Sequence, residues 1–193
     1  VPIGTGYCGP TVAAGRVYVM DREAEPEEIE RVHCFAWETG ESLWSHEYPC
    51  SYDGVSYKAG PRCSVQIQDG LAYSLGTKGH LFCFDAVSGD VRWQKDLNKE
   101  YAIDMPIWGI SAAPVIEGKL LIVPVSGKDA YLVAFDRKTG KEQWRAFSDR
   151  GNYSAPIVID HAGKRVLLLC GGHVHVRRYI QSGCEKRITR CCE

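Results

Sequence analysis

The stretch Ala134-Phe-Asp136-Arg-Lys-Thr139-Gly140-Lys-Glu-Gln-Trp144 decides the fold of this chain, because versions of it occur twice more. The earlier copies read Cys34-Phe-Ala-Trp-Glu-Thr-Gly40-Glu-Ser-Leu-Trp44 and Cys83-Phe-Asp85-Ala-Val-Ser-Gly89-Asp-Val-Arg-Trp93. The three tryptophans stand 49 and then 51 residues apart, and each follows its glycine by four positions. A fixed period near fifty residues is typical of propellers, solenoids and other repeat arrays. The most conspicuous residues of the chain are therefore expected to hold neighbouring repeats together.

Each repeat has the pattern of four short β-strands. In the second copy, apolar strands are predicted at 71–75, 80–84 and 91–95, separated by turns rich in aspartate and glycine. Such turn residues between apolar runs favour hairpins. A further strand precedes each unit, and proline stands in it at positions 10, 114 and 156, whereas 62–65 has none. Proline is tolerated only at an edge or at the first position of a strand, so this strand is expected at the inner end of a blade.

The fold class predicted from this pattern is all-β, a partial β-propeller of four-stranded antiparallel blades. The chain forms one incomplete domain, 1–193, with about three and a half blades. The blade-like repeats are expected at approximately 5–49, 50–98, 99–148 and 149–193, and the last is degenerate after Gly171. So few blades do not close a common propeller ring. We therefore expect an internal fragment or processed form that exposes a blade face and aggregates or is only partly ordered in isolation.

Composition excludes some classes of function. The 23 basic and 24 acidic residues give a formal net charge of −1, which lacks the basic footprint of a nucleic-acid-binding protein. No apolar run approaches the roughly 20 residues of a membrane-spanning helix, so no membrane span is predicted. Nine cysteines are an odd number, and at least one therefore has no partner within the chain.

The cysteines divide into two groups by position. Cys34 and Cys83 begin the first two repeat elements where the third has Ala134, which indicates a small buried site in which free cysteine acts as a small hydrophobe. Cys8, Cys50 and Cys63 lie in loop-like sequence and can pair in an oxidising compartment. The sequence does not choose partners among them.

The third copy matches, at every defined position, the tryptophan-docking motif of the pyrroloquinoline-quinone (PQQ) propeller family. The chain resembles this family, which includes quinoprotein alcohol dehydrogenases and the propeller lipoprotein of the outer-membrane barrel-assembly machine, over residues 5 to 170. The second copy departs from the motif at Ser88 and Asp90, and the first has Ala36 in place of aspartate, so its turn should be less well tied. The resemblance implies that one set of residues docks each blade on the next: Gly40, Trp44, Asp85, Gly89, Trp93, Asp136, Thr139, Gly140 and Trp144.

The resemblance leaves three functions open. The first is a binding or scaffold module without catalysis, whose partner is a protein or the remaining blades of its own propeller. The second is a fragment of a PQQ-dependent alcohol dehydrogenase, with the quinone on the propeller axis beside calcium and an aspartate base. The third is a sensor or docking propeller of a larger multidomain protein. The resemblance also implies a periplasmic or otherwise extracytoplasmic location.

Candidate cofactor-binding residues for the dehydrogenase alternative stand where blades begin. They are Arg62, Asp104 and Trp108, with Lys58 and Tyr153 as further candidates. Each also has a structural explanation, since tryptophan can pack, aspartate can cap a loop and arginine can be a surface charge. No catalytic residue and no calcium constellation is identified, so neither PQQ nor calcium is predicted outside that alternative.

Two remaining segments contain side chains that can bind metal ions and are therefore considered as candidate metal sites. The acidic run 23–31 is interpreted as an enlarged, solvated loop in preference to a calcium loop. In the tail, His173 and His175 have strand spacing but no identifiable third ligand, and Cys191-Cys192 lacks the context of a vicinal disulfide. No metal site is predicted. The tail departs so far from the repeat that we expect the reading frame to have slipped near Gly171, with a divergent terminal repeat as the alternative.

Overall fold

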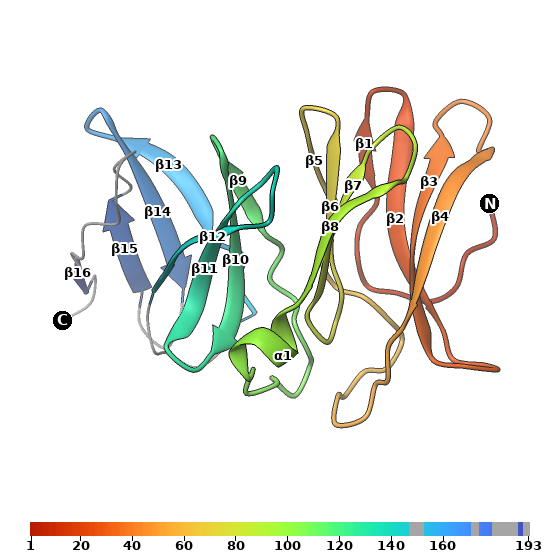
Figure 1. Cartoon of the computed structure of the whole chain (residues 1–193), viewed down its shortest axis with the longest axis horizontal. Coiled ribbons are helices and arrows are strands. Elements are labelled where there is room, and N and C mark those ends of the chain that lie inside the picture. The colour runs from red at the N-terminus through yellow and green to blue at the C-terminus, as the bar shows by residue number, and fades with distance from the viewer. Residues whose placement is uncertain (147–152, 171–173, 179–188, 191–193) are drawn as a thin grey trace.

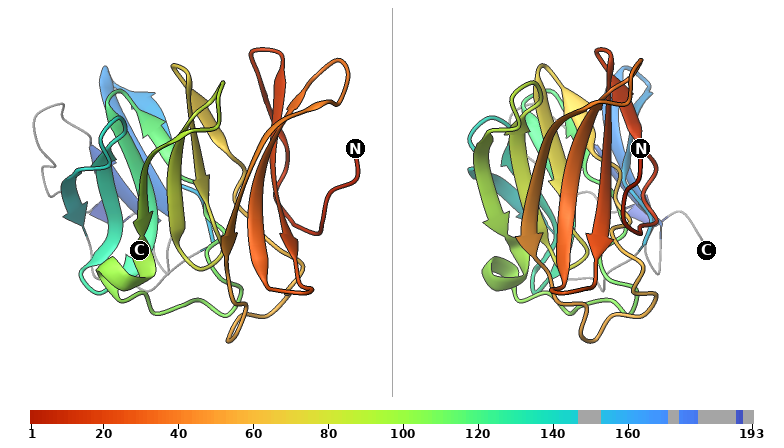
Figure 2. Two further views of the ribbon diagram at one scale, coloured as in Figure 1. Left: turned by 45° about the vertical axis from the view of Figure 1, so that its right-hand side comes forward. Right: turned by 90° about the vertical axis from the view of Figure 1, so that its right-hand side faces the viewer.

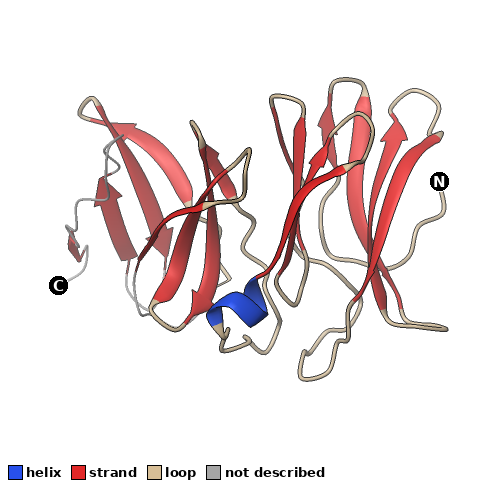
Figure 3. Ribbon diagram, in the orientation of Figure 1, coloured by secondary structure: helices blue, strands red, loops and turns tan. Residues whose placement is uncertain are grey.

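The computed structural model describes residues 1–146, 153–170, 174–178 and 189–190. In this part of the chain, four four-stranded antiparallel sheets and one short helix stand side by side (Figure 1; Figure 3). The all-β, propeller-type architecture predicted from the repeats is confirmed. None of the described helices is long and apolar enough to cross a membrane.

Each sheet is a simple meander in which consecutive strands are hydrogen-bonded neighbours. The first sheet contains β1 (Thr11–Ala13), β2 (Arg16–Glu23), β3 (Ile29–Ala36) and β4 (Ser42–Pro49). The second contains β5 (Gln66–Gln68), β6 (Leu71–Leu75), β7 (His80–Asp85) and β8 (Val91–Asp96), and is followed by α1 (Leu97–Tyr101). The third contains β9 (Val115–Glu117), β10 (Leu120–Gly127), β11 (Ala130–Asp136) and β12 (Glu142–Ala146). The fourth contains β13 (Ile157–His161), β14 (Lys164–Cys170), β15 (Val174–Arg178) and β16 (Thr189–Arg190).

The sheets follow one another in chain order, so that each inner sheet packs against two neighbours (Figure 2). Apolar side chains fill the spaces between them. One cluster includes Trp44 of the first sheet and Phe84 of the second, whose ring centroids are 5.5 Å apart. Burial on both faces explains why β10 and β11 are continuously apolar instead of alternating.

The same irregularity recurs in the first three sheets. In each of these sheets the register between the third and fourth strands shifts between the first residue of the repeat element and the phenylalanine that follows it. The shifts lie after Cys34, after Cys83 and after Ala134. A β-bulge inserts one residue and re-aims the side chains around it. Here it lets each tryptophan lie opposite the first residue of its repeat element.

The structure corrects two expectations. Strand β15 pairs with β14 and β16 pairs with β15, so the fourth sheet has four strands where the repeat pattern predicts only half a blade. Gly171, His173 and the Cys191-Cys192 pair lie outside the described residues, and the proposed frame slip stays a prediction.

The interpretation of 23–31 as an enlarged solvated loop holds only for the middle of this segment, where residues 24–27 are exposed. Strand β2 extends to Glu23 and β3 begins at Ile29, which leaves only 24–28 between them. Glu30 is fully buried. Glu23 and residues 29–31 of this charged run therefore belong to the sheet, and residues 24–28 form the loop.

Candidate functional site

The connections between sheets meet at one end of the molecule, the end that carries α1 in Figure 1. Side chains from the segment before β1 and from the three connections between sheets line a pocket of about 310 Å³ there. The segment before β1 contributes Tyr7, and the β4–β5 connection contributes Tyr57 and Arg62. The β8–β9 connection contributes Trp108 and Ser111, and Tyr153 follows from the connection before β13. We call this the aromatic pocket.

The rings of the aromatic pocket lie close to one another and open to solvent. The centroids of Trp108 and Tyr153 are 4.6 Å apart, and those of Tyr57 and Trp108 are 6.3 Å apart. Tyr7, Tyr57 and Trp108 are 52%, 67% and 45% exposed. Large aromatic rings are normally buried in the protein interior, so three exposed rings around one pocket indicate a surface that binds a ligand.

Arg62 forms one wall of the aromatic pocket and fixes the shape of the loop beside it. Its Nη1 atom donates to the Gly60 carbonyl at 2.5 Å, and its Nη2 atom donates to the carbonyls of Ser56 at 2.9 Å and Tyr57 at 2.6 Å. The guanidinium also lies 5.2 Å from the centroid of the Tyr7 ring. Carbonyl groups satisfy the donors without neutralising the charge, so the pocket keeps a cation in its wall.

The sequence candidates separate clearly in the structure. Arg62, Trp108 and Tyr153 are brought together in the aromatic pocket, whereas Asp104 and Lys58 are exposed and do not line it. The Lys58 carbonyl instead accepts a hydrogen bond from Arg22.

Sequence reasoning missed Tyr7 and Tyr57. A usable signal existed, since both precede an inner strand, as Trp108 and Tyr153 do.

The repeated elements make equivalent contacts between adjacent sheets. The Nε1 atom of Trp44 donates to the Ala86 carbonyl at 3.2 Å, and that of Trp93 donates to the Arg137 carbonyl at 3.1 Å. Each ring lies so close to the next glycine that an added Cβ would approach it to 2.7 Å at Gly89 and 2.8 Å at Gly140. The contribution of these contacts to stability stays a prediction.

Aspartate ties the turns that present these glycines. The Oδ1 atom of Asp85 accepts from the N–H groups of Val87 and Ser88, and Asp136 does the same for Lys138 and Thr139. In the first copy Ala36 has no side-chain acceptor. The turn there is closed by the backbone hydrogen bond that the Gly40 N–H donates to the Ala36 carbonyl.

Two tyrosines that the sequence reasoning did not single out reinforce the same acceptors. Tyr18 and Trp44 both donate to the Ala86 carbonyl, and Tyr73 and Trp93 both donate to that of Arg137. Each tyrosine pairs across the sheet with the cysteine of its repeat, and Ile122 occupies this place in the third sheet. In two of the three copies, therefore, a tyrosine and a tryptophan donate to the same carbonyl of the next sheet, and we call this arrangement a two-donor clamp.

Five cysteines are free thiols: Cys8, Cys34, Cys50, Cys63 and Cys83. Cys34 and Cys83 are fully buried, as expected of small hydrophobes. Cys50 and Cys63 are buried as well, and Cys8 is partly buried with its thiol near the Met20 carbonyl. No disulfide joins Cys8, Cys50 and Cys63 in this structure.

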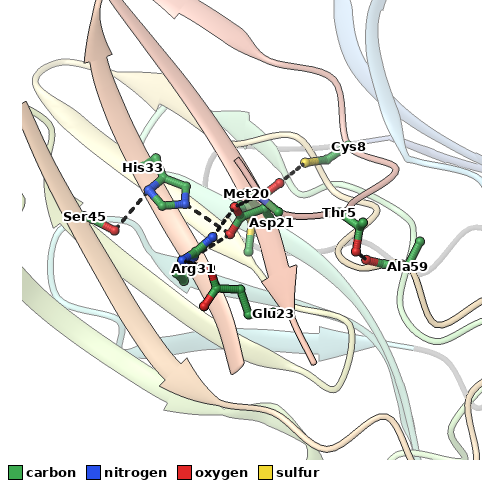
Figure 4. Close-up of polar contacts among 10 residues, drawn as sticks. Thr5, Cys8, Met20, Asp21, Glu23, Arg31, His33, Ser45 and Ala59 are labelled. Carbon is green, nitrogen blue, oxygen red and sulfur yellow. Dashed lines mark hydrogen bonds and ion pairs between the residues drawn. The ribbon is translucent and has the colours of Figure 1, made fainter. Parts of the chain in front are cut away.

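A second polar cluster lies on the first sheet (Figure 4). Asp21 is fully buried and pairs with Arg31 at 2.7 Å and with His33 Nε2 at 3.1 Å. Burial alone would raise the pKa of Asp21, but the nearby His33 ring and the hydrogen bonds from Arg31 and the Gly4 N–H outweigh it and hold that pKa well below its usual range. The other ring nitrogen of His33 lies 3.0 Å from Ser45 Oγ.

This order of serine, histidine and aspartate has the atoms of a nucleophilic relay. Hydrolysis also needs donors aimed at the developing oxyanion. Ser45 lies in the middle of β4, and the backbone N–H groups of a strand lie in the plane of its sheet, not above it. We therefore interpret the cluster as the ion pairing that neutralises Asp21.

A family model described as "Outer membrane protein assembly factor BamB" matches residues 28–183, which is most of the chain. The chain belongs to this PQQ-like propeller family. Its recurring Asp…Gly…Trp elements and four-stranded sheets are the features expected of such a propeller.

Curated relatives of this PQQ-like propeller include two dehydrogenases. The chain is 34% identical over 96 residues to quinoprotein ethanol dehydrogenase from Pseudomonas aeruginosa, covering 49% of the chain and 14% of the relative. It is 31% identical over 134 residues to 1-butanol dehydrogenase (quinone) from Thauera butanivorans, covering 66% and 20%. The chain thus spans a fifth or less of the length of these two proteins.

Solved structures support the fold alone. BamB from Moraxella catarrhalis aligns with a TM-score of 0.61 at 13% identity, over 96% of this chain and 48% of that one. Quinohemoprotein alcohol dehydrogenase ADHIIG from Pseudomonas putida aligns with a TM-score of 0.59 at 18% identity, over 92% and 29%.

The dehydrogenase relatives raise the question of whether the aromatic pocket fits PQQ and calcium. Its rings and the Arg62 cation suit a flat group that bears acceptors. Calcium requires several oxygen ligands, typically carboxylates, and the residues that line the pocket in the described chain include no carboxylate. The site of this PQQ-like propeller therefore does not fit the quinone–calcium pair, and we derive no redox step for it.

Proposed function

We propose that this PQQ-like propeller is a binding module that recognises a protein partner through the aromatic pocket and performs no chemistry there. The observation that carries the proposal is the gathering of exposed rings around Arg62: Tyr7, Tyr57 and Trp108 come from three different connections and share one opening.

The chemistry of the pocket resembles the centre of a protein–protein interface. Tyrosine, tryptophan and arginine supply most interface energy, because they bury a large area at small cost in conformational entropy. An apolar side chain of the partner would pack between Tyr57 and Trp108, and a neighbouring carboxylate or carbonyl would face Arg62. The proposed partner is therefore an extended segment with an apolar anchor beside an acceptor group.

The proposal includes an extracytoplasmic, most simply periplasmic, setting. The family description concerns assembly of outer-membrane proteins, and a protein that handles other proteins there needs a recognition surface but no cofactor.

Selection from a displayed random peptide library tests the pocket directly. Wild-type protein should enrich peptides with an apolar anchor, and the Tyr57→Ala/Trp108→Ala variant should weaken their binding at least tenfold, since each truncated anchor costs about 1–2 kcal/mol. Trp37→Ala is the matched control, because Trp37 is 60% exposed but lies in the β3–β4 turn at the opposite end. Failure to enrich peptides, or equal loss in the control, would refute the proposal.

The dehydrogenase alternative rests on the curated relatives, all of which bear dehydrogenase names. It predicts that PQQ binds in a calcium-dependent manner and that Trp108→Ala abolishes binding. Quenching of tryptophan fluorescence by PQQ, with and without Ca²⁺, distinguishes the two proposals. Calcium-dependent binding lost in Trp108→Ala would favour the dehydrogenase.

A further inference from the structure

A buried carboxylate without a basic partner lies between the first two sheets. Glu30 of β3 is fully buried, and no ion pair neutralises it among the described residues. Its Oε2 atom accepts from the Tyr48 hydroxyl at 2.7 Å, and its Oε1 atom accepts from the Tyr52 hydroxyl and from the Thr77 N–H at 3.1 Å. These bonds fix the carboxylate but leave its charge uncompensated, and an isolated buried charge is costly.

Two further metal-binding side chains face this carboxylate. One ligand atom each from Glu30, Cys50 and His80 lies within 4.8 Å of the other two. Cys50 follows β4, and His80 begins β7 on the second sheet, so the cluster spans the sheet interface. The Nδ1 atom of His80 is buried and makes no hydrogen bond within the described chain. A buried imidazole nitrogen without a partner is a lone pair or proton left for a ligand.

We propose that Glu30, Cys50 and His80 bind a divalent zinc-like metal ion. Carboxylate oxygen, thiolate sulfur and imidazole nitrogen are the donors that zinc takes from proteins. Zn²⁺ with one carboxylate and one thiolate is electrically neutral, so the ion removes the uncompensated charge of Glu30. Cys50 loses its thiol proton to solvent when the metal binds.

The geometry requires a small closure. With bond lengths of about 2.0–2.3 Å, ligand atoms of a tetrahedral zinc site lie roughly 3.3–3.8 Å apart. The distances between the ligand atoms, which are now up to 4.8 Å, therefore shorten by up to about 1.5 Å on binding. Tyr48 and Tyr52 already orient the carboxylate through their hydroxyl groups, as hydrogen-bonding neighbours of metal ligands do.

Without metal, the surroundings keep the other two ligands neutral. Burial raises the pKa of the Cys50 thiol, with a further contribution from the Glu30 charge. Burial likewise lowers the pKa of His80. A neutral imidazole can coordinate directly, whereas a thiol must lose its proton when the metal binds.

Cobalt substitution tests the site in the full chain. Protein stripped with chelator and titrated with Co²⁺ should develop thiolate-to-cobalt charge-transfer absorption that saturates at one equivalent. Cys50→Ser should abolish this absorption, and His80→Gln should weaken binding at least tenfold. Tyr48→Phe, which removes only an orienting hydroxyl, should weaken it about 10- to 100-fold.

Controls separate the site from other thiols and from the tail. Cys63→Ser removes a buried free thiol outside the cluster and should leave the titration unchanged. A variant with Gln at His173 and His175 and Ser at Cys184, Cys191 and Cys192 should also behave as wild type. If Cys50→Ser does not fold, the wild-type titration and His80→Gln decide alone. Absence of thiolate–cobalt absorption in wild-type protein, or its loss only in the tail variant, would overturn the proposal.

Discussion

Replacing Gly89 by alanine tests whether the contact between Trp44 and the next sheet holds the blades together. The added Cβ would approach the Trp44 ring to 2.7 Å, whereas ordinary contacts begin near 3.4 Å. The ring has little freedom to retreat, because it is 9% exposed and its Nε1 atom is bound to the Ala86 carbonyl. Overpacking of a fixed neighbour costs about 1–3 kcal/mol.

A second cost arises from the backbone, since φ at Gly89 is +80°. Alanine in this left-handed region costs about 1–2 kcal/mol, so the total expected loss is about 2–5 kcal/mol. Gly70→Ala isolates the backbone cost, because Gly70 has φ of +73° and nothing within 4 Å of its added Cβ. Gly89→Ala should therefore destabilise the protein by about 1–3 kcal/mol more than Gly70→Ala.

Urea unfolding followed by circular dichroism measures both variants without relying on tryptophan emission. Repeating the pair in a Trp44→Ala background should reduce the cost of Gly89→Ala to that of Gly70→Ala, because no ring remains to clash. Equal losses for Gly89→Ala and Gly70→Ala in the wild-type background would refute the docking contact.

Three further predictions concern the same framework. Trp93→Ala should cost about 3–5 kcal/mol in urea unfolding, as expected for a large packed ring, and a loss below 1 kcal/mol would contradict its docking role. Tyr73→Phe should cost only about 0.5–1.5 kcal/mol, because Trp93 still donates to the Arg137 carbonyl; a larger loss would show that the two donors act as one unit. The lowered pKa of Asp21 means that its stabilisation is complete above the unfolded-state pKa near 4 and is lost as pH falls towards the folded-state value. Thermal midpoints of wild type should therefore fall more steeply than those of Asp21→Asn below pH 4, and parallel curves would refute the assignment.

The repeat pattern predicted the sheets because its information is local. Turn glycines and apolar runs fix each strand, and the period fixes the order of the blades. The clamp tyrosines escaped notice, since Tyr18 and Tyr73 share a position that Ile122 occupies in the third copy. Partial repetition in three copies is a weak signal.

Burial of charge was not predictable from the charged run itself. Glu30 lies in a run with Glu27, Glu28 and Arg31, which predicts a solvated side chain. In the structure it is buried, and it accepts hydrogen bonds from the hydroxyls of Tyr48 and Tyr52 and from the N–H of Thr77. The aromatic pocket was predicted only in part from the sequence. Arg62 and Trp108 were selected by position, whereas Tyr57 was passed over although it also precedes an inner strand.

Fluorine NMR of protein labelled with 5-fluorotryptophan tests the proposed binding function most directly, because the chain has five tryptophans that report from different places. Trp108 lines the aromatic pocket, Trp37 lies at the other end, and Trp44 and Trp93 lie between sheets. A selected peptide should shift the Trp108 resonance and leave that of Trp37 unchanged, whereas PQQ with Ca²⁺ should shift neither. Peptide binding that leaves Trp108 unmoved would contradict the account.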